Sequence, residues 1–139
     1  AKKSGKTPSR KDWRICRDVY VADTDEEARE AALNGMTGRV WRDYLFPLFQ
    51  EFDLVPIFKH DPEVPDEAVD IEYLADHMWL MGSPETVSNK IRTLYNEVGG
   101  FGNLTTLVFD QSENQKGWDK SMRLMAEEVI PSLSDLVPA

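Results

Sequence analysis

The sequence of 139 residues is poor in side chains that bind metals or form crosslinks, since it contains one cysteine and two histidines. A single thiol, Cys16, excludes a disulfide within the chain and is typical of a reducing compartment. His60 and His77 do not stand at metal-ligand spacing from each other or from the cysteine, so we predict no metal site. No apolar run approaches the roughly 20 residues that span a membrane, and no signal-peptide pattern is present. We therefore expect a cytoplasmic protein without a membrane partner.

Positive charge is also scarce in this chain. It has 16 lysine and arginine residues against 25 aspartate and glutamate residues, which gives a formal net charge of −9 at pH 7. An acidic surface repels phosphate backbones, so nucleic acid is not an expected partner. Only residues 1–11 are basic, and we interpret them as a solvated segment. The 41% of hydrophobic residues suffices for the core of one domain or of part of a larger one.

Residues 13–21 form the first apolar segment. Apolar and aromatic side chains fall on both of its faces, which predicts a strand largely buried on both sides, with Cys16 as an inert buried thiol. Arg14, Arg17 and Asp18 interrupt this strand. If it is central, their charges need partners or a polar cavity.

Two helical patterns follow this strand. Thr24 and Glu27 form a capping box, and Gly35 ends or bends the first helix. Residues 37–52 form a second pattern, in which Pro47 predicts a kink or break near the preceding residue. The face of the second helix that we expect to be buried contains Trp41, Leu45, Leu48 and Phe52.

The stretch of residues 55–70 contains three prolines and a cluster of acids, and it predicts a loop or lid that lies outside the core. A short helix is expected around residues 70–77. Because loops are the usual carriers of function on α/β scaffolds, this stretch is a candidate cover for a site.

The last part of the chain alternates between helix and strand. Ser83 is a suitable N-cap for a helix over residues 84–98, and two glycines end that helix. Residues 104–109 predict a buried strand, and residues 117–133 predict a final helix that Pro131 disturbs. A helix that leads into a buried strand is the repeating unit of parallel α/β proteins.

Few residues suggest chemistry. Capping explains Ser83 without any nucleophilic role, although Gly82 and Ser83 precede a helix whose free N–H groups could bind an anion. Arg39, Trp41 and Arg42 form a basic and aromatic patch, for which a solvated helix face is the alternative explanation. Since no acid–base pair is evident, no catalytic residue is predicted.

Four segments carry a resemblance to a known family: WRICRDVYVADTDEEA, WRDYLFPLF, DHMWLMGSPETVSNKIRTLYNEVGGFG and SMRLMAEEVIPSL. The most distinctive parts are GSPETV, GGFG and AEEVIPSL. Together they resemble the C-terminal part of the bacterial luciferase-like flavin-dependent monooxygenases, over roughly residues 12–134.

This resemblance implies an α/β fold, namely the C-terminal fragment of a (β/α)8 TIM barrel with the last two strands, a long lid connection and two flanking helices. Residues 13–21 are similar to the seventh strand, and residues 22–81 are similar to the variable connection over the active-site mouth, here named the lid segment. Residues 84–98 resemble the seventh helix, 104–109 the eighth strand and 117–133 the closing helix. Two strands cannot close a barrel, so the segment is expected to pair with the remainder of its barrel or to form a homo-oligomer.

The resemblance also implies an activity for the complete protein, which would insert one oxygen atom from O2 into a small organic substrate. It implies FMN as reduced flavin, NADH or NADPH as an indirect electron source and a flavin reductase as a partner. This segment alone is expected to be inactive. The residues expected near the cofactor are Met81, Gly82 and Ser83 at the rim and Arg39, Trp41 and Arg42 on the lid segment, with Asp23 and Asp110 at the strand ends. The alternatives are a non-catalytic oligomerising barrel remnant and a deazaflavin-dependent oxidoreductase.

Overall fold

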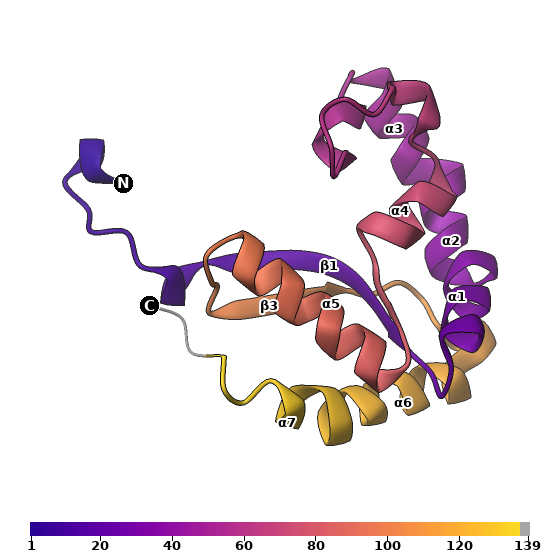
Figure 1. The fold of residues 1–139 in the computed structure, drawn as a ribbon. Coiled ribbons are helices and arrows are strands. Elements are labelled where there is room, and N and C mark those ends of the chain that lie inside the picture. The colour runs from indigo at the N-terminus through magenta and orange to yellow at the C-terminus, as the bar shows by residue number, and fades with distance from the viewer. Residues whose placement is uncertain (137–139) are drawn as a thin grey trace.

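Three parallel strands lie at the centre of the computed structural model, which describes residues 1–136 (Figure 1). Strand β1 (Arg14–Val21) lies between β2 (Leu80–Gly82) and β3 (Asn103–Leu107). The first part of β1 pairs with β3, with Arg14 opposite Asn103, and its last three residues pair with β2. The predicted strands over residues 13–21 and 104–109 are confirmed, but the prediction of only two strands was wrong. Strand β2 was not predicted, because its three residues are too few to show a periodicity.

One face of the sheet is covered by helices from the second half of the chain. Helix α5 (Pro84–Glu97) packs on this face together with a long terminal helix, which runs through α6 (Gln115–Leu124), the π-helical turn η7 (Met125–Val129) and α7 (Ile130–Ser132). The buried members of this cluster are Val19, Val21, Leu80, Val87, Ile91, Phe101 and Val129. The terminal helix was predicted over residues 117–133, so its position is confirmed.

The opposite face of the sheet is covered only over the last residues of β1. The lid segment packs there on Tyr20 and Ala22, whereas Cys16 is exposed. The predictions of a strand buried on both sides and of a buried thiol were therefore wrong for the first half of β1. Leu107 on β3 is also 39% exposed. Strand β1 was expected to be buried because its sequence is apolar on both faces. Over its first half, however, other parts of the chain cover only one of these faces.

The lid segment begins with a well-capped helix. The Thr24 hydroxyl accepts a hydrogen bond from the backbone N–H of Glu27, and Gly35 ends α1 (Asp25–Asn34). Ala28 and Ala32 are buried, so α1 can approach the sheet closely. The predicted cap and the predicted stop are both confirmed.

The second helix of the lid segment is continuous through a change of winding. It runs from α2 (Met36–Val40) through the π-helical turn η3 (Trp41–Leu45) into α3 (Phe46–Glu51). The backbone N–H of Phe46 donates to the carbonyl of Trp41, five residues earlier. Such a turn makes room for Pro47, which lacks an N–H and would clash with the preceding turn of a regular helix. The predicted irregularity near Phe46 is thus a π bulge, and the helix does not break.

The π turn contains one residue more than a regular helical turn, and this changes which later side chains face the core. Trp41 and Phe46 are buried, whereas Leu48 is 39% and Phe52 is 65% exposed. The predicted buried face is confirmed for Trp41 and for Leu45, which is half-buried and packs on the core. It was wrong for Leu48 and Phe52, because a π turn rotates all later side chains around the helix axis.

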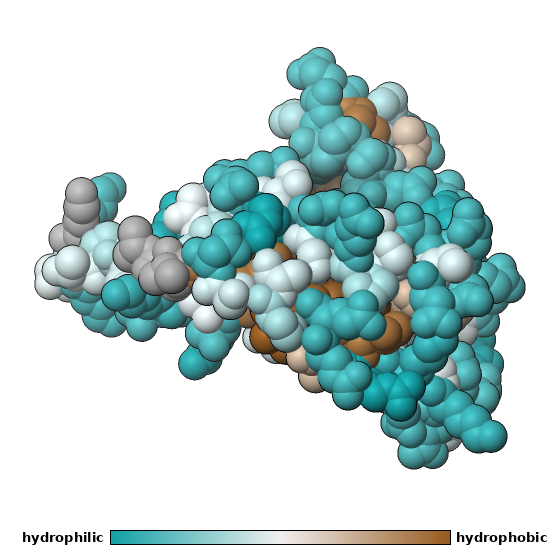
Figure 2. Space-filling model, turned by 60° about the horizontal axis from the view of Figure 1, so that its bottom comes forward, coloured by the Kyte–Doolittle hydropathy of each residue, from teal (hydrophilic) through white to brown (hydrophobic). Residues whose placement is uncertain are grey.

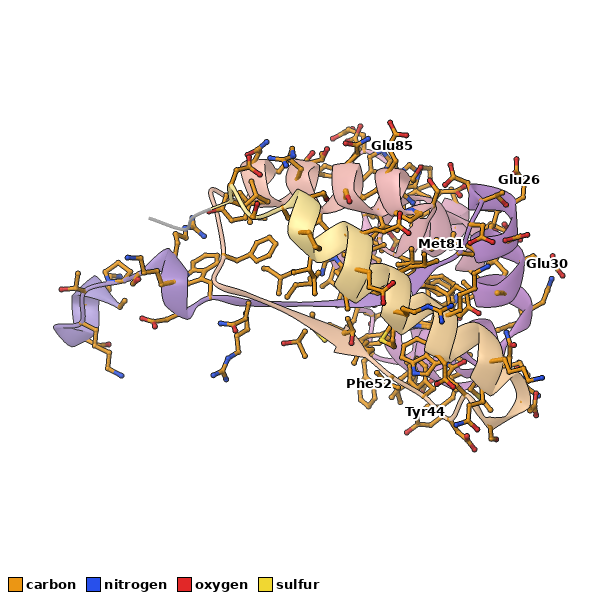
Figure 3. All side chains as sticks on the ribbon, turned by 90° about the horizontal axis from the view of Figure 1, so that it is seen from below. Glu26, Glu30, Tyr44, Phe52, Met81 and Glu85 are labelled. Atoms are coloured by element: carbon orange, nitrogen blue, oxygen red, sulfur yellow. The ribbon has the colours of Figure 1, made fainter. Side chains whose placement is uncertain are left out.

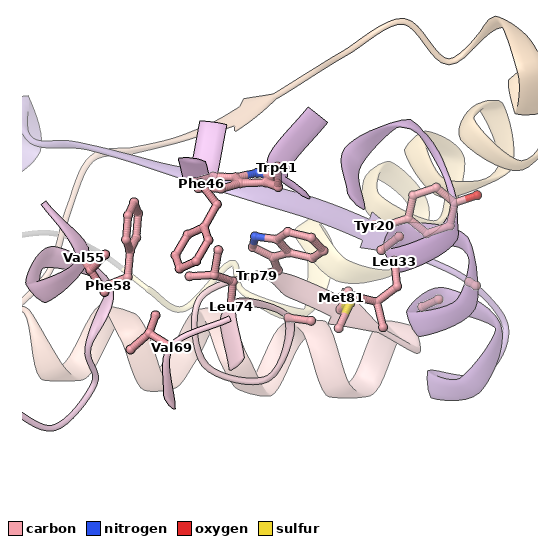
Figure 4. Close-up of a cluster of buried hydrophobic side chains, with 14 residues drawn as sticks. Tyr20, Leu33, Trp41, Phe46, Val55, Phe58, Val69, Leu74, Trp79 and Met81 are labelled. Atoms are coloured by element: carbon pink, nitrogen blue, oxygen red, sulfur yellow. The ribbon is translucent and has the colours of Figure 1, made fainter. Parts of the chain in front are cut away.

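The proline-rich stretch contributes to the core, contrary to prediction. Val55, Phe58 and Val69 are buried, and they pack with Trp41 and Leu74 in one cluster (Figure 4). The stretch contains the 3-10 turns η4 (Val55–Phe58) and η5 (Asp66–Ala68), and α4 (Ile71–His77) follows it. The predicted helix around residues 70–77 is confirmed, with Asp70 as its N-cap.

The outer edge of β2 is closed by a lysine from α5. Since the carbonyl of Gly82 accepts from the backbone N–H of Ala22, directly after β1, the carbonyl of Met81 points to the other edge. Lys90 Nζ donates to this carbonyl at 3.1 Å and lies 3.5 Å from that of Trp79. The ammonium group thus occupies acceptors that another strand would otherwise use.

Short 3-10 turns complete the described chain: η1 (Lys2–Ser4), η2 (Arg10–Asp12) and η6 (Ser112–Asn114). Among residues 1–136, no helix combines the length and the apolar character that crossing a membrane requires. Figure 2 shows apolar residues gathered in the middle of one face, within a frame of hydrophilic ones.

A buried serine of the terminal helix holds the end of β1. Ser121 is fully buried, and its hydroxyl accepts a hydrogen bond of 2.8 Å from the backbone N–H of Val21. Ser121→Ala leaves this buried N–H without a partner, so we expect the free energy of unfolding to fall by about 1–3 kcal/mol. Urea unfolding followed by circular dichroism measures the change. Ser134→Ala, at an exposed position near the same end of the chain, is the control and should unfold like the unchanged protein.

Candidate functional site

A buried carboxylate joins the lid segment to the sheet. Asp18 lies on β1 with 5% of its surface exposed, and its Oδ2 accepts a hydrogen bond of 3.0 Å from the indole N–H of Trp41. Burial raises the pKa of Asp18 to about 6, against the opposing effects of the Trp41 hydrogen bond and of the Arg17 charge. The charge that interrupted the predicted strand therefore has a specific partner on the lid segment.

Aromatic rings surround the indole of Trp41 (Figure 4). The ring of Phe49 stacks on it with centroids 6.1 Å apart, and Phe58 meets it edge-on at 5.5 Å. The ring of Trp79 is tilted against it at 6.2 Å. Such contacts restrict the indole, so its N–H is held toward the carboxylate.

The N-terminus of α5, where the sequence suggested an anion, is occupied by a side chain of the protein itself. The Ser83 hydroxyl caps the helix by accepting from the N–H of Thr86 at 3.3 Å, as predicted. The N–H of Ser83 donates to Asp25 at 2.7 Å, and the Thr86 hydroxyl donates to the same carboxylate at 3.0 Å. These hydrogen bonds, that of the Ser83 N–H foremost, lower the pKa of Asp25.

Gly82 permits this arrangement. Its φ of +145° is unfavourable for other residues, and a Cβ at this position would lie 2.7 Å from the Asp25 carboxylate and from the Thr86 methyl group. The role of Gly82 and Ser83 in this structure is thus to hold an internal carboxylate. The prediction that they offer free N–H groups to an external anion was wrong.

The basic and aromatic patch divides into separate contacts. Arg39 forms an ion pair with Glu113 beyond β3, and Arg42 donates to the carbonyl of Leu33 at 3.2 Å, near the end of α1. Trp41 points inward instead. The structure therefore does not bring the two guanidinium groups and the indole together into one binding surface.

Met81 and Trp41 do belong to one cluster, but both are buried in it (Figure 4). Of the two strand-end carboxylates, Asp23 forms an ion pair with Lys120. Asp110 accepts from the N–H of Ser112 at 2.9 Å, and this contact lowers its pKa. Within residues 1–136 no group of three or more histidine, cysteine, aspartate or glutamate side chains is arranged for a metal ion.

Apolar side chains are exposed on the lid segment. Tyr44 and Phe52 are 63% and 65% exposed, and Figure 3 shows both on the far side of β3 from α5. Sequence reasoning missed the exposure of Phe52 because this side chain was expected in the core, and it missed the role of Asp18 because Trp41 lies 23 residues away.

The raised pKa of Asp18 predicts a dependence of stability on pH. The folded state binds the proton more tightly than an ordinary carboxyl of pKa 3.8 does, so the contribution of Asp18 to stability is greatest below pH 3.8 and is lost as the pH rises through 6. At about 1.4 kcal/mol per tenfold change in proton affinity, this contribution to the free energy of unfolding should fall by about 3 kcal/mol between these pH values.

Asp18→Asn keeps an oxygen for the Trp41 indole and carries no charge. We therefore expect the unfolding free energy of Asp18→Asn, minus that of the unchanged protein, to increase between pH 4 and pH 7. Urea unfolding at several pH values measures this difference. Asp43→Asn, at an exposed position of η3, is the matched control. A constant difference for Asp18→Asn would show that burial does not disfavour the charged Asp18.

Known proteins resemble this chain over almost its whole length. It is 37% identical over 131 residues to 2,5-diketocamphane 1,2-monooxygenase 1 of Pseudomonas putida. This alignment covers 93% of the chain and 36% of that relative. It is 30% identical over 139 residues to limonene 1,2-monooxygenase of Rhodococcus erythropolis, which covers 99% of the chain and 33% of that relative. No family model matches the chain.

A solved structure agrees with these relatives. It is described as a type II Baeyer–Villiger monooxygenase, the oxygenating constituent of 3,6-diketocamphane monooxygenase from the CAM plasmid of Pseudomonas putida, in complex with FMN. It superposes with a TM-score of 0.86 and 31% identity, over 98% of this chain and 37% of the other. The chain is therefore homologous to a part of these monooxygenases, and it spans about a third of their length.

Proposed function

We propose that the chain is a segment of a flavin-dependent monooxygenase, which in complete form inserts one oxygen atom from O2 into a small organic substrate. The observation that carries this proposal is the close match, with a TM-score of 0.86 over 98% of the chain, to an oxygenase that was solved with FMN. Bound reduced flavin would supply the electrons that activate oxygen. NADH or NADPH would reduce the flavin, through a separate flavin reductase.

The segment is proposed to complete a (β/α)8 barrel. Each part of β1 is paired on one side only, since Arg14–Asp18 pair with β3 and Val19–Val21 with β2. Helices cover one face, while Cys16 and Leu107 are exposed on the other. Parallel strands with helices on a single side and free edges are expected of a part of a closed barrel, whose inner face is covered by the remaining strands. A second copy of the chain is the alternative cover.

We propose that Ser83, Arg39 and Arg42 do not bind the phosphate of FMN. The N–H of Ser83 is engaged by Asp25, and Arg39 and Arg42 have partners of their own. We therefore propose that the rest of the barrel binds the phosphate, and that these residues are not direct phosphate ligands.

The contribution of this segment is proposed to lie on the substrate side. Tyr44, Leu48 and Phe52 are exposed apolar side chains of the lid segment. An apolar lid excludes water from a reaction with activated oxygen and favours an apolar substrate. The mouth of the proposed site would thus be lined by side chains that sequence periodicity assigned to the core.

A segment exchange tests this proposal. We would replace the aligned third of the 3,6-diketocamphane oxygenase with this chain, and expect the hybrid to retain FMN through gel filtration and to oxygenate an apolar cyclic ketone. Flavin absorbance and product chromatography are the measurements. The chain alone should bind no FMN, because it lacks the phosphate site. Phe52→Asp in the hybrid should lower product formation at least tenfold and leave FMN bound, and exposed Glu51→Asp is its control.

The outcomes separate the alternatives. A folded hybrid without FMN would contradict the proposed function. If the chain alone forms a stable oligomer while the hybrid is inactive, the non-catalytic barrel remnant is supported. Retention of a deazaflavin in place of FMN would favour the deazaflavin-dependent oxidoreductase.

A further inference from the structure

Four buried side-chain polar atoms of the described residues have no hydrogen-bond partner, and two of them belong to residues that line one cavity. These two are Oδ1 of Asp18, whose other oxygen accepts from Trp41, and Nε1 of Trp79. Both side chains are more than nine-tenths buried, with 5% and 3% of their surfaces exposed. Buried polar groups in folded proteins nearly always have a partner, so two such atoms close together require an explanation.

Both residues line the same small cavity. Its wall comprises Asp18, Val19, Tyr20, Ala32, Thr37, Trp79 and Met81, from β1, the lid segment and β2. The centre of a water molecule can occupy about 10 Å³ within this cavity. One water molecule therefore fits, whereas an organic ligand does not.

The two atoms have complementary chemistry. A carboxylate oxygen accepts hydrogen bonds, and an indole N–H only donates. A molecule between them must therefore donate on one side and accept on the other, which water does. Thr37 also lines the cavity, and its hydroxyl can take the second hydrogen of such a molecule. Two to four polar partners are typical of buried water.

We propose that this cavity is a binding site for one water molecule, which donates to Asp18 Oδ1 and accepts from Trp79 Nε1. Asp18 then holds two indoles, Trp41 directly and Trp79 through the water. Trp41 lies in the first half of the lid segment, and Trp79 lies just before β2, where the segment ends. The water site thus fastens both parts of the lid segment to one side chain of β1. The inference does not depend on the proposed enzymatic activity.

Nuclear magnetic resonance of the indole groups in the full chain tests this site. The four tryptophans give four indole N–H resonances. We expect Trp79 Hε1 to show a cross-peak with water whose sign indicates a long-lived contact. Trp13, which is 44% exposed, should show only rapid exchange with the solvent. Absence of a long-lived water contact at Trp79 in the unchanged protein overturns the proposal, whatever the variants do.

A matched pair of substitutions adds a second measurement. Ala32→Val adds two methyl groups to the cavity wall and should displace the water, so that the Trp79 cross-peak disappears. Ala28→Val adds the same volume one turn earlier in α1, at a position that is equally buried but does not line the cavity. It should keep the cross-peak. If Ala32→Val folds and retains the cross-peak, the water lies elsewhere and the site is wrong.

Discussion

The hydrogen bond between the Trp41 indole and the Asp18 carboxylate is the contact on which the arrangement of the lid segment depends. It places a polar pair in an interior that is otherwise apolar and aromatic, where an unpaired carboxylate would be costly. Apolar contacts alone would allow the lid helix to slide along the sheet, because they have little directionality. One indole N–H on one carboxylate oxygen selects a single position.

The two prolines within helices show how the chain preserves this position. Pro47 and Pro131 each follow a π-helical turn, η3 and η7. In both places the helix continues, since the wider turn accommodates the proline ring. In the lid segment the turn also carries Trp41 at its start, so the residue that contacts Asp18 stands where the winding changes. The proline therefore affects the geometry of the contact although it lies outside it.

Local signals in the sequence were reliable where a side chain binds backbone only a few residues away. Thr24 and Ser83 each cap a helix as predicted, by accepting hydrogen bonds from N–H groups three residues later. Contacts between distant segments were not readable in the same way. Asp25 lies 58 residues from Ser83. Neither segment has a sequence pattern which indicates that the Asp25 carboxylate binds the N-terminus of α5.

Burial was predicted less well than secondary structure, for two different reasons. The π turn changed the exposed side of the lid helix, which helical periodicity cannot detect. The apolar character of β1 and β3 predicted a double cover, and the family resemblance indicated that most of that cover belongs to other strands. Exposed Cys16 and Leu107 are therefore consistent with the sequence once its apolar residues are read as those of a larger protein.

The Lys90 ammonium restricts where further strands can pair with the sheet. A chain that exposes unpaired strand edges is at risk of stacking into fibres through repeated edge contacts. Here the carbonyls at the outer side of β2 are occupied, so further strands can add beside β3 or along the first half of β1 but not beyond β2. The lysine therefore closes the part of this edge that β2 forms, and the part along the first half of β1 stays open.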